Sequence, residues 1–423
     1  MSKNKPTTEN KSEDFAKFQA PLLARSEERL IQKLIEANSD CIGKEPLLSI
    51  LVRSGKAAKD FTSNDCKVLP TWAEVVDLYG EKPIIFGLDS CARYREHLQA
   101  QKDGFLPVPL EFTNLTVPPK PQPRVAGLFN TGTNALAQSF WLNIEQLKFN
   151  FGNGADPRRN KTRYDFEEYN LFEGKHVPPK REWYTTFNRT AAGRWNLLPV
   201  VLIRDPFRWM QSMCRVQYNA RWAKGMEGHC PNLVPNEQER QQYPRFRNMS
   251  TFPVNISLRN VYFDHYSSLA DLWSSWNRLY FDADFPRLMI RFEDTLFHAE
   301  EVMHHIKVCV GLPTGNPYRY NLGKSKRTKG ADFTSALAKY GTHRGRFDGL
   351  YPEDLLCCLD TSSSFQCRNC KDIVATDKGQ EYRHRLFVSF GSQRFIFLGS
   401  LIKMCAHPRR EPVRDLVRGT FRS

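Results

Sequence analysis

The stretch of this chain most suited to chemistry is a short polar turn, Asn130–Asn134, which reads Asn-Thr-Gly-Thr-Asn. A short apolar run precedes it and predicts a buried strand over Arg124–Phe129. Apolar residues at helical spacing then predict a helix from about Asn134 to Leu147. A glycine-centred turn between a strand and a helix directs backbone N–H groups to the positive end of the helix, which is a ready anion site. Many α/β proteins contain such a turn and bind nothing there, so the turn alone is weak evidence.

A second unit of the same kind begins with another apolar run, Leu198–Ile203. Asp205 is suited to cap the next helix, which is predicted over Phe207–Trp222 after a proline in its first turn. Arg204 would then lie at the carboxyl end of its strand, where open α/β sheets bind ligands. Ser212 would lie about two turns into the helix. A surface Arg paired with Asp205 and an ordinary helix Ser explain the same residues.

Two further groups of residues have side chains suited to catalysis or anion binding. Lys175 and His176 lie between the two units. A His titrates near neutrality and can remove a proton from a hydroxyl, although a His that merely packs at a turn is the alternative. A later basic run contains Arg327, Lys329 and Gly330. Composition alone favours a solvated charged loop for that run.

Taken together, these stretches resemble the sulfotransferase family. In that family the first motif binds a 5′-phosphosulfate group, and an Arg and a Ser at this spacing bind the 3′-phosphate. A late strand ends in Arg-Tyr-Glu-Asp before a helix, and a Lys-Gly in a C-terminal loop closes over the nucleotide. The order and spacing of all four motifs fit this chain. They are Phe129–Leu136, Arg204 with Ser212, Leu288–Asp294 followed by His298–Glu301, and Lys329 with Gly330.

A narrower likeness points to algal and diatom sulfotransferases. Gly174–Pro178 is similar to their Gly-Lys-His turn, and stretches upstream of the first motif look like theirs. The resemblance implies a Golgi enzyme anchored by an N-terminal helix. The sequence itself contains neither a secretory signal peptide nor a run of about 18 apolar residues, which favours the cytoplasm unless an anchor is missing. The upstream stretches are Leu69–Trp72, Leu78–Gly80, Gly87–Cys91 and Tyr94–Arg95.

The resemblance implies transfer of a sulfuryl group from 3′-phosphoadenosine 5′-phosphosulfate (PAPS) to a hydroxyl or amine, with a carbohydrate as the expected acceptor. Backbone N–H groups of the turn would cradle the 5′-phosphate, and the basic loop would close the site. No metal is expected, because a sulfate ester carries less charge than a phosphoryl group and no Gly-Lys-Ser/Thr follows the glycine. The residues assigned to the nucleotide are Asn130, Thr131, Gly132, Thr133, Asn134, Arg204, Ser212, Arg327, Lys329 and Gly330.

The same resemblance assigns the catalytic residues. His176 is expected to be the general base, with Lys175 near the bridging oxygen of the donor. The chain departs from the family at Asn130, where many members carry Lys or Arg. An Asn can donate a hydrogen bond but supplies no charge. Lys175 is therefore expected to supply the missing cation, and poor turnover is the alternative.

Two other functions fit the composition. The chain of 423 residues carries a formal net charge of +15, which predicts acidic partners. A phosphotransferase could use the same loop, although neither a Mg²⁺ carboxylate nor a loop lysine is evident. A non-catalytic binder of polyanions would also be basic, but no RNA-binding signature, zinc-finger spacing or basic repeat is present, so no nucleic-acid partner is predicted.

The predicted architecture is α/β, with a P-loop-like central parallel sheet flanked by helices and a mostly helical N-terminal extension. Residues 1–14 are polar and charged and predict a disordered tail. Residues 15–117 form the predicted extension, and 118–350 the catalytic domain. Residues 351–423 form a C-terminal extension that contains cysteines.

Cysteines and glycosylation sequons bear on the compartment. Eleven cysteines are many for a cytosolic protein, and core or disulfide cysteines are the favoured interpretation. A zinc site built on Cys367 and Cys370, with Cys405 and His407, is the alternative. Five Asn-X-Ser/Thr sequons mildly favour a secretory glycoprotein: Asn114, Asn160, Asn188, Asn248 and Asn255.

Overall fold

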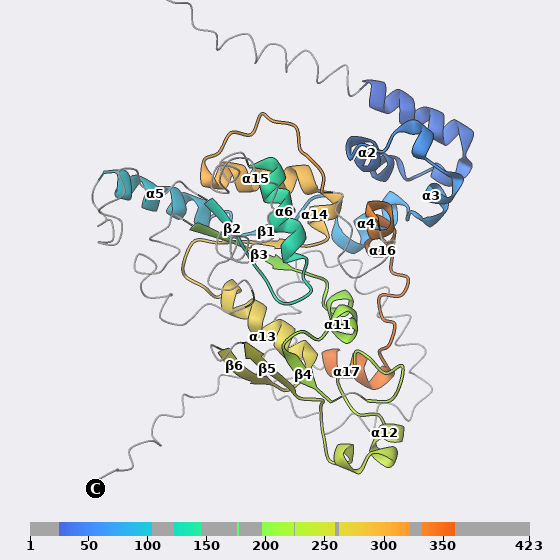
Figure 1. Cartoon of the computed structure of the whole chain (residues 1–423), viewed down its shortest axis with the longest axis vertical. Helices are drawn as coiled ribbons and strands as arrows, with labels where there is room; N and C mark the ends of the chain where they lie inside the picture. The colour runs from blue at the N-terminus through green and yellow to red at the C-terminus, as the bar shows by residue number, and fades with distance from the viewer. Residues whose placement is uncertain are drawn as a thin grey trace, which may run out of the picture. The chain divides into compact units, whose positions relative to one another are not determined.

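The computed structural model describes residues 25–103, 122–144, 176, 197–223, 225–258, 262–321 and 332–359 (Figure 1). The chain forms two compact units. The first unit comprises Met1–Trp209 and Ala283–Phe347, and the second comprises Met210–Asp282 and Asp348–Ser423.

A four-stranded sheet of order β1-β7-β3-β2 forms the centre of the first unit. β2 (Gln122–Ala126), β3 (Leu197–Ile203) and β7 (Leu288–Arg291) are parallel, and β1 (Ile85–Phe86) joins β7 as an antiparallel edge strand. β3 is wholly apolar and β7 is apolar up to Arg291, as expected for strands covered on both faces, whereas β2 also contains Gln122 and Arg124. The predicted α/β class, with a mostly parallel sheet flanked by helices, is confirmed.

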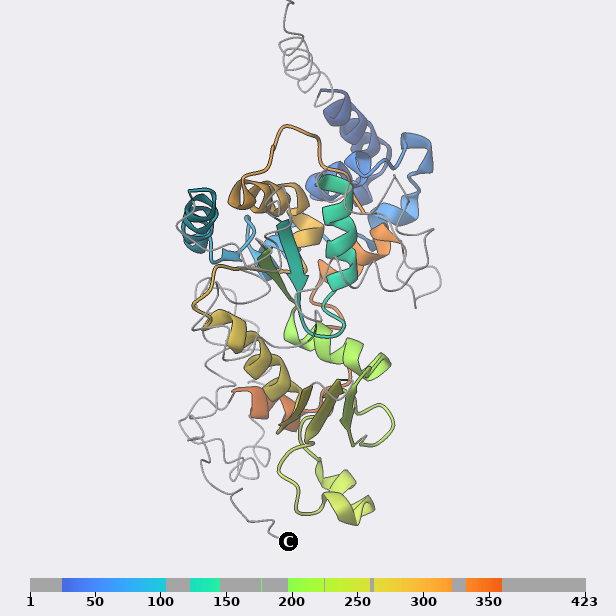
Figure 2. The same ribbon diagram turned by 60° about the vertical axis from the view of Figure 1, so that its left-hand side comes forward.

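Three helices pack with the sheet in one hydrophobic core: α5 (Ser90–Lys102), α6 (Thr133–Asn143) and α15 (Ala299–Val310). Alternate residues of the strands enter this core, such as Val200 and Leu202, because side chains one residue apart point to opposite faces. Figure 2 shows α6 and α15 beside the strands. A disulfide between Cys91 and Cys309 joins α5 to α15 across a sequence separation of 218 residues.

The N-terminal helices belong to the same unit. Residues 25–37 are helical, and η1 (Ser39–Cys41), α2 (Glu45–Arg53), η2 (Ala58–Asp60), α3 (Ser63–Val68) and α4 (Trp72–Tyr79) follow. Capping boxes start α3 at Thr62 and α4 at Thr71, each with an acidic side chain three residues on. Their core includes α14 (Asp294–Phe297) and α16 (Phe333–Tyr340), so these helices pack against the part of the chain that follows β7.

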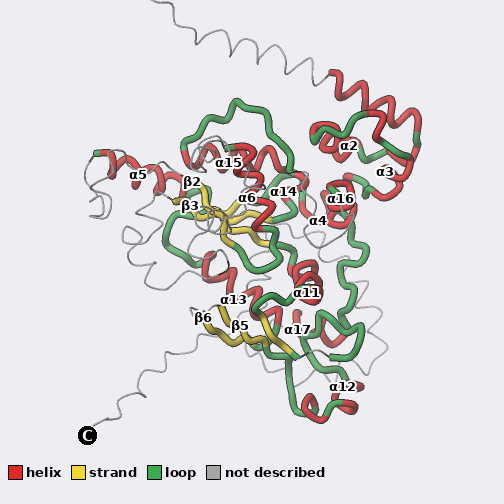
Figure 3. The backbone as a smooth tube through the Cα atoms, in the orientation of Figure 1, coloured by secondary structure: helices red, strands yellow, loops and turns green. Residues whose placement is uncertain are grey.

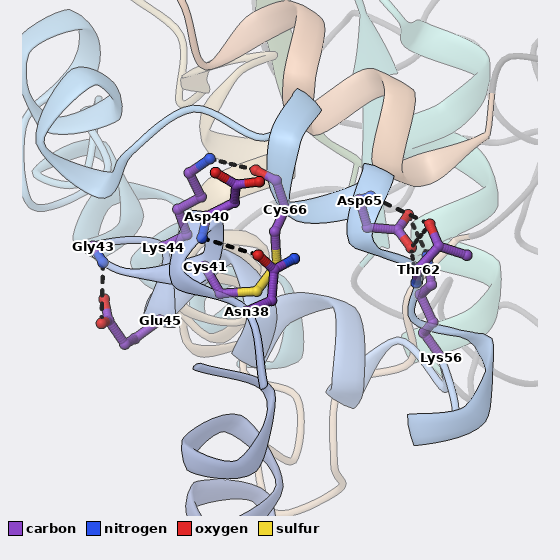
Figure 4. The surroundings of a disulfide bond; sticks show 10 residues. All are labelled: Asn38, Asp40, Cys41, Gly43, Lys44, Glu45, Lys56, Thr62, Asp65 and Cys66. Carbon is purple, nitrogen blue, oxygen red and sulfur yellow. Dashed lines mark hydrogen bonds and ion pairs between the residues drawn. A yellow bond between two sulfur atoms is a disulfide. The ribbon is translucent and has the colours of Figure 1, made fainter. Parts of the chain in front are cut away.

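A disulfide between Cys41 and Cys66 holds η1 to α3 (Figure 4). The buried Lys44 ammonium donates a hydrogen bond to the carbonyl oxygen of Cys66 beside it. Within the segment that this disulfide closes, Lys56 forms an ion pair with Asp65 at 2.6 Å. The disulfide and these two side-chain contacts tie the short helical region together.

The second unit contains a three-stranded antiparallel sheet of order β4-β5-β6 (Figure 3). Its strands are β4 (Ala220–Trp222), β5 (Val254–Leu258) and β6 (Tyr262–Tyr266). The helices of this unit are α12 (Glu237–Gln242), α13 (Leu269–Phe281) and α17 (Pro352–Leu359), with the short η5 (Pro244–Phe246). A third disulfide joins Cys214 to Cys230.

The structure corrects three predicted boundaries. The helix predicted from about Asn134 to Leu147 ends at Asn143, and Ile144 is extended. The helix predicted over Phe207–Trp222 is wrong beyond Arg215: α11 spans Pro206–Arg215, and the backbone of Tyr218 then adopts a positive φ of 52°. The next residues pair with β5 as β4, so cross-strand hydrogen bonds override their local apolar pattern. The strand predicted over Arg124–Phe129 starts and ends earlier, at Gln122–Ala126, because the following residues form the turn.

Six of the eleven cysteines form the three disulfides, and the interpretation of the C-terminal cysteines stays a prediction. Cys357 and Cys358 lie on α17, and the proposed zinc ligands Cys367, Cys370 and Cys405 lie outside the described residues, as does His407. Within the described ranges no group of three or more His, Cys, Asp or Glu residues is arranged to hold a metal ion. In the same ranges no helix is both long enough and apolar enough to span a membrane.

Candidate functional site

The polar turn lies between β2 and the amino end of α6. Asn130 and Gly132 both have positive φ angles, of 60° and 93°, and Gly132 is the N-cap residue of α6. The Thr131 hydroxyl donates to the carbonyl oxygen of Leu128 at 2.8 Å, which closes the turn. Because Gly132 has no side chain, no side-chain hydrogen bond from the N-cap residue covers the first N–H groups of α6. The turn therefore has the form of an anion-binding loop.

Two glycines allow this turn to pack tightly. A Cβ on Gly127 would lie 2.7 Å from the Thr131 hydroxyl oxygen and 2.9 Å from the carbonyl oxygen of Leu202. A Cβ on Gly132 would lie 2.4 Å from the ring of Phe292, which follows β7. The turn is thus wedged between the end of β3 and the end of β7, and its shape depends on both.

Replacing Gly132 by alanine tests that shape. The added methyl group would clash with Phe292, and an L residue at φ 93° is strained, so we expect a loss of about 1–3 kcal/mol in stability together with loss of anion binding. Gly311→Ala is the matched control, since Gly311 also has a positive φ but has no atom within 4 Å of the added Cβ. Chemical denaturation and calorimetric titration with a nucleotide measure the two effects. Equal loss of binding in both variants would contradict a specific role for the turn.

Arg204 joins the second unit of strand and helix to this turn. β2 and β3 are parallel neighbours, so their carboxyl ends meet at one edge of the sheet. Arg204 follows β3 directly, and its Nη1 donates to the carbonyl oxygen of Asn130. Trp209 adds a second link, because its Nε1 donates to the carbonyl oxygen of Phe129 at 2.6 Å. The two predicted anion-binding turns therefore lie side by side.

The Arg204 side chain is 6% exposed and is enclosed by aromatic rings. Its guanidinium carbon lies 5.3 Å from the ring centre of Phe292 and 4.9 Å from that of Tyr340. Nη2 donates to the Tyr340 hydroxyl at the end of α16. Arg204 is therefore held in place by the residue after β7 and by α16 as well as by the turn, and Asp205 forms its ion pair with Arg346.

His176 lies directly against the turn. Its Nδ1 is 2.7 Å from the carbonyl oxygen of Gly127, and its ring centre is 4.5 Å from that of Phe129. A carbonyl oxygen only accepts, so Nδ1 must carry the proton in this hydrogen bond. In that neutral tautomer the lone pair is on Nε2, which is the form a general base requires. The structure thus brings the candidate base and the polar turn together.

His229, in the second unit, has a different environment. It is 1% exposed, and each ring nitrogen lies 2.7 Å from a carboxylate oxygen, one of Glu239 and one of Asp354. Burial acts to lower the pKa of His229, but hydrogen bonds and charge from the two carboxylates outweigh it and raise the pKa. A buried His with both nitrogens committed has no lone pair to offer a substrate. His229 is a structural residue of the second unit.

A buried network of charges supports the end of β3. Asp205 caps α11 as predicted, accepting from the Arg208 N–H at 3.0 Å, and its other oxygen is paired with Arg346. Glu293 accepts from the Asp205 N–H at 3.2 Å. Burial, with the charge of Asp205, raises the pKa of Glu293 to about 7, against the lowering effect of Arg204.

The raised pKa of Glu293 predicts a pH dependence of stability. The folded protein holds the proton of the Glu293 carboxyl more tightly than the unfolded chain does. The contribution of protonated Glu293 to the free energy of unfolding is therefore complete below about pH 4.5 and is lost as the pH rises through about 7. Glu293→Gln keeps an acceptor for Asp205 but cannot ionise. We expect this variant to gain up to about 3 kcal/mol relative to the wild type between pH 5 and pH 8. Denaturation across that pH range measures it, and parallel profiles would contradict the assignment.

The segments on either side of the basic run are attached to α6 and α11, the helices that follow β2 and β3. Before it, the Asn143 side chain on α6 accepts from the Arg319 N–H at 2.7 Å and donates to the Arg319 carbonyl at 2.9 Å. After it, Arg208 on α11 donates to four backbone carbonyl oxygens between residues 339 and 345. The two flanks of residues 322–331 are therefore fixed to α6 and to the start of α11.

The predicted site residues fall into three groups. The turn residues Asn130–Asn134, Arg204 and His176 lie together at one edge of the sheet. Ser212 is buried on α11 and accepts from the Arg215 guanidinium at 3.0 Å. Lys175, Arg327, Lys329 and Gly330 lie outside the described residues.

Two residues beside the turn were missed at the sequence level. Phe292 lies within the stretch that resembles the Arg-Tyr-Glu-Asp motif, so a signal for it existed. Tyr340 carries no local signal, because its contact with Arg204 spans 136 positions in the sequence.

Comparison of the chain with protein-family models, curated proteins and solved structures found no match.

Proposed function

We propose that this chain is a PAPS-dependent sulfotransferase with a P-loop-like catalytic α/β domain, of the algal and diatom type that it resembles. The observation that carries the proposal is the hydrogen bond from Arg204 to the carbonyl oxygen of Asn130. This hydrogen bond fixes a cation at the carboxyl end of β3, next to the amino end of α6, whose N-cap residue is Gly132. A nucleotide with phosphates at both its 3′ and 5′ positions needs two such neighbouring anion sites.

In this proposal the turn binds the 5′-phosphosulfate through backbone N–H groups of Gly132–Asn134 and the Thr133 hydroxyl. The Thr131 N–H, assigned to the same group from the sequence, donates to the carbonyl oxygen of Leu128 at 3.4 Å. Arg204 binds the 3′-phosphate, with Ser212 assigned to the same group by its spacing. Arg327, Lys329 and Gly330 are assigned to closure over the nucleotide by the resemblance. The anchored flanks of residues 322–331, on α6 and α11, support that assignment.

The reaction is an in-line displacement at sulfur. The acceptor hydroxyl loses its proton to Nε2 of His176 while its oxygen bonds to sulfur, and the bond from sulfur to the bridging oxygen breaks. The hydrogen bond from Nδ1 to Gly127 supports this role because it fixes the required tautomer. Lys175 is assigned to the charge that develops on the leaving oxygen, in place of the cation that Asn130 does not supply.

The acceptor is proposed to be a carbohydrate and the compartment the Golgi lumen. The disulfides support an oxidising compartment. The net charge of +15 suits an anionic donor and an acidic glycan.

A thermal-shift comparison of nucleotides tests the donor class first. Adenosine 3′,5′-bisphosphate is expected to raise the melting temperature at concentrations where ATP with Mg²⁺ does not. The opposite order would favour a phosphotransferase. Transfer of labelled sulfate from PAPS to a panel of glycans and small alcohols then tests catalysis. Polyanion binding without any transfer would favour the non-catalytic alternative.

A further inference from the structure

The turn that follows η5 in the second unit carries a sequon, Asn248-Met-Ser250. The side chains of Asn248 and Ser250 are both exposed, whereas Phe246 just before them is fully buried. Side-chain hydrogen bonds hold the backbone of this turn. Arg240 on α12 donates to the carbonyl oxygens of Phe246, Arg247 and Met249 at 3.3, 3.1 and 2.8 Å.

Asn255, in the second described sequon, is also exposed, but it lies within a sheet and not in a turn. It lies on β5, the central strand of the three-stranded sheet, with Arg221 opposite it on β4 and His265 opposite it on β6. Its side-chain oxygen lies 2.6 Å from Nδ1 of His265. Cross-strand neighbours on both sides restrict the space for a bulky group at this position. Asn248 lies in a turn, and within the described part of the chain no strand is paired with it.

The disulfides give independent evidence on the compartment. Cys214–Cys230 lies in the same unit as the turn, and Cys41–Cys66 and Cys91–Cys309 lie in the first unit. Disulfides of this number are typical of chains that mature in the secretory lumen and are rare in the cytosol. The attachment of N-linked glycans takes place in that same lumen and requires an accessible Asn-X-Ser/Thr.

We infer that Asn248 is a site of N-linked glycosylation in this protein. The Asn248 amide nitrogen loses one proton and bonds to the anomeric carbon of an oligosaccharide carried on a lipid pyrophosphate. The bond from that carbon to the phosphate oxygen breaks, and the lipid pyrophosphate leaves with the electron pair. The glycan then projects from an exposed turn, so it requires no rearrangement of the fold. This inference does not depend on the proposed sulfotransferase activity.

Peptide mapping of the chain purified from the cells that produce it tests the inference directly. Trypsin releases residues 248–259 as one peptide, which contains both described sequons. Enzymatic removal of N-glycans in heavy-oxygen water converts a glycosylated Asn to a labelled Asp. We expect the label at Asn248, and fragmentation of the peptide distinguishes it from Asn255. An unlabelled Asn248 in that peptide would overturn the inference.

Variants provide a second test in the full chain directed into the secretory lumen of a eukaryotic host. Asn248→Gln and Ser250→Ala are each expected to remove one glycan, seen as one step in gel mobility. Asn255→Gln is the matched control and is expected to migrate with the wild type. If both variants at the turn migrate with the wild type, the site is not used. Glycosidase treatment should bring all four chains to the same position.

Discussion

Replacing His176 by alanine is expected to lower the rate of sulfate transfer by about 10²- to 10⁴-fold, the usual contribution of a general base. Nε2 carries the lone pair because Nδ1 donates to the carbonyl oxygen of Gly127. Nucleotide affinity should change little, since in this account the turn and Arg204 make the phosphate contacts. Single-turnover transfer of labelled sulfate and calorimetric titration with adenosine 3′,5′-bisphosphate measure the two quantities separately.

His176→Asn separates catalysis from positioning. The Asn side chain can still donate to the Gly127 carbonyl in place of Nδ1, but it has no basic nitrogen. If His176 is the base, the Asn and Ala variants lose turnover to a similar extent. If the histidine only holds the turn in shape, the Asn variant keeps most of the activity, and the assignment of the base is wrong.

Replacing Arg346 by alanine is expected to destabilise the first unit by about 3–5 kcal/mol, because it leaves the buried Asp205 carboxylate without its ion-pair partner. The Arg346 and Asp205 side chains in this pair are only 10% and 3% exposed. The Arg346 guanidinium also lies against the rings of Phe207 and Phe347, at 5.4 and 5.6 Å from their centres. Chemical denaturation of the variant measures the loss.

Two further variants test the cause of that loss. Asp205→Asn combined with Arg346→Met removes both charges and should recover much of the stability, since the penalty comes from one uncompensated charge. Arg278→Ala breaks an exposed pair with Asp282 and should cost less than about 1 kcal/mol. A loss as small for Arg346→Ala as for Arg278→Ala would show that the buried pair is not what holds the end of β3.

Local patterns in the sequence were sufficient for β3 and for the start of α11. The apolar run at Leu198–Ile203 became β3 with one residue added, and Asp205 caps α11 as its type and position indicated. Local patterns failed where a distant strand competes. Ala220–Trp222 continues a helical pattern, yet it pairs with Val254–Ile256. No feature near it in the sequence predicts that partner.

In the candidate site, too, residues near the strand ends could be predicted and residues distant in the sequence could not. The glycine of the turn, its neighbours and Arg204 could be identified because each follows directly after a short apolar run that predicts a strand. The aromatic rings around Arg204 could not, because Tyr340 comes from a helix that follows β7 by some distance in the chain. The ion-pair partner of Asp205 could not be identified either, because Arg346 lies 141 positions later in the chain.

The central claim is that one nucleotide bridges the turn at Gly132 and the guanidinium of Arg204. The most direct test is calorimetric titration of wild type and Arg204→Ala with adenosine 3′,5′-bisphosphate and with adenosine 5′-monophosphate. The wild type should prefer the bisphosphate, and Arg204→Ala should weaken its binding by about 1.5–3 kcal/mol while affecting the monophosphate less, so that the preference collapses. Unchanged affinity for the bisphosphate, or an equal loss for both nucleotides, would contradict the account.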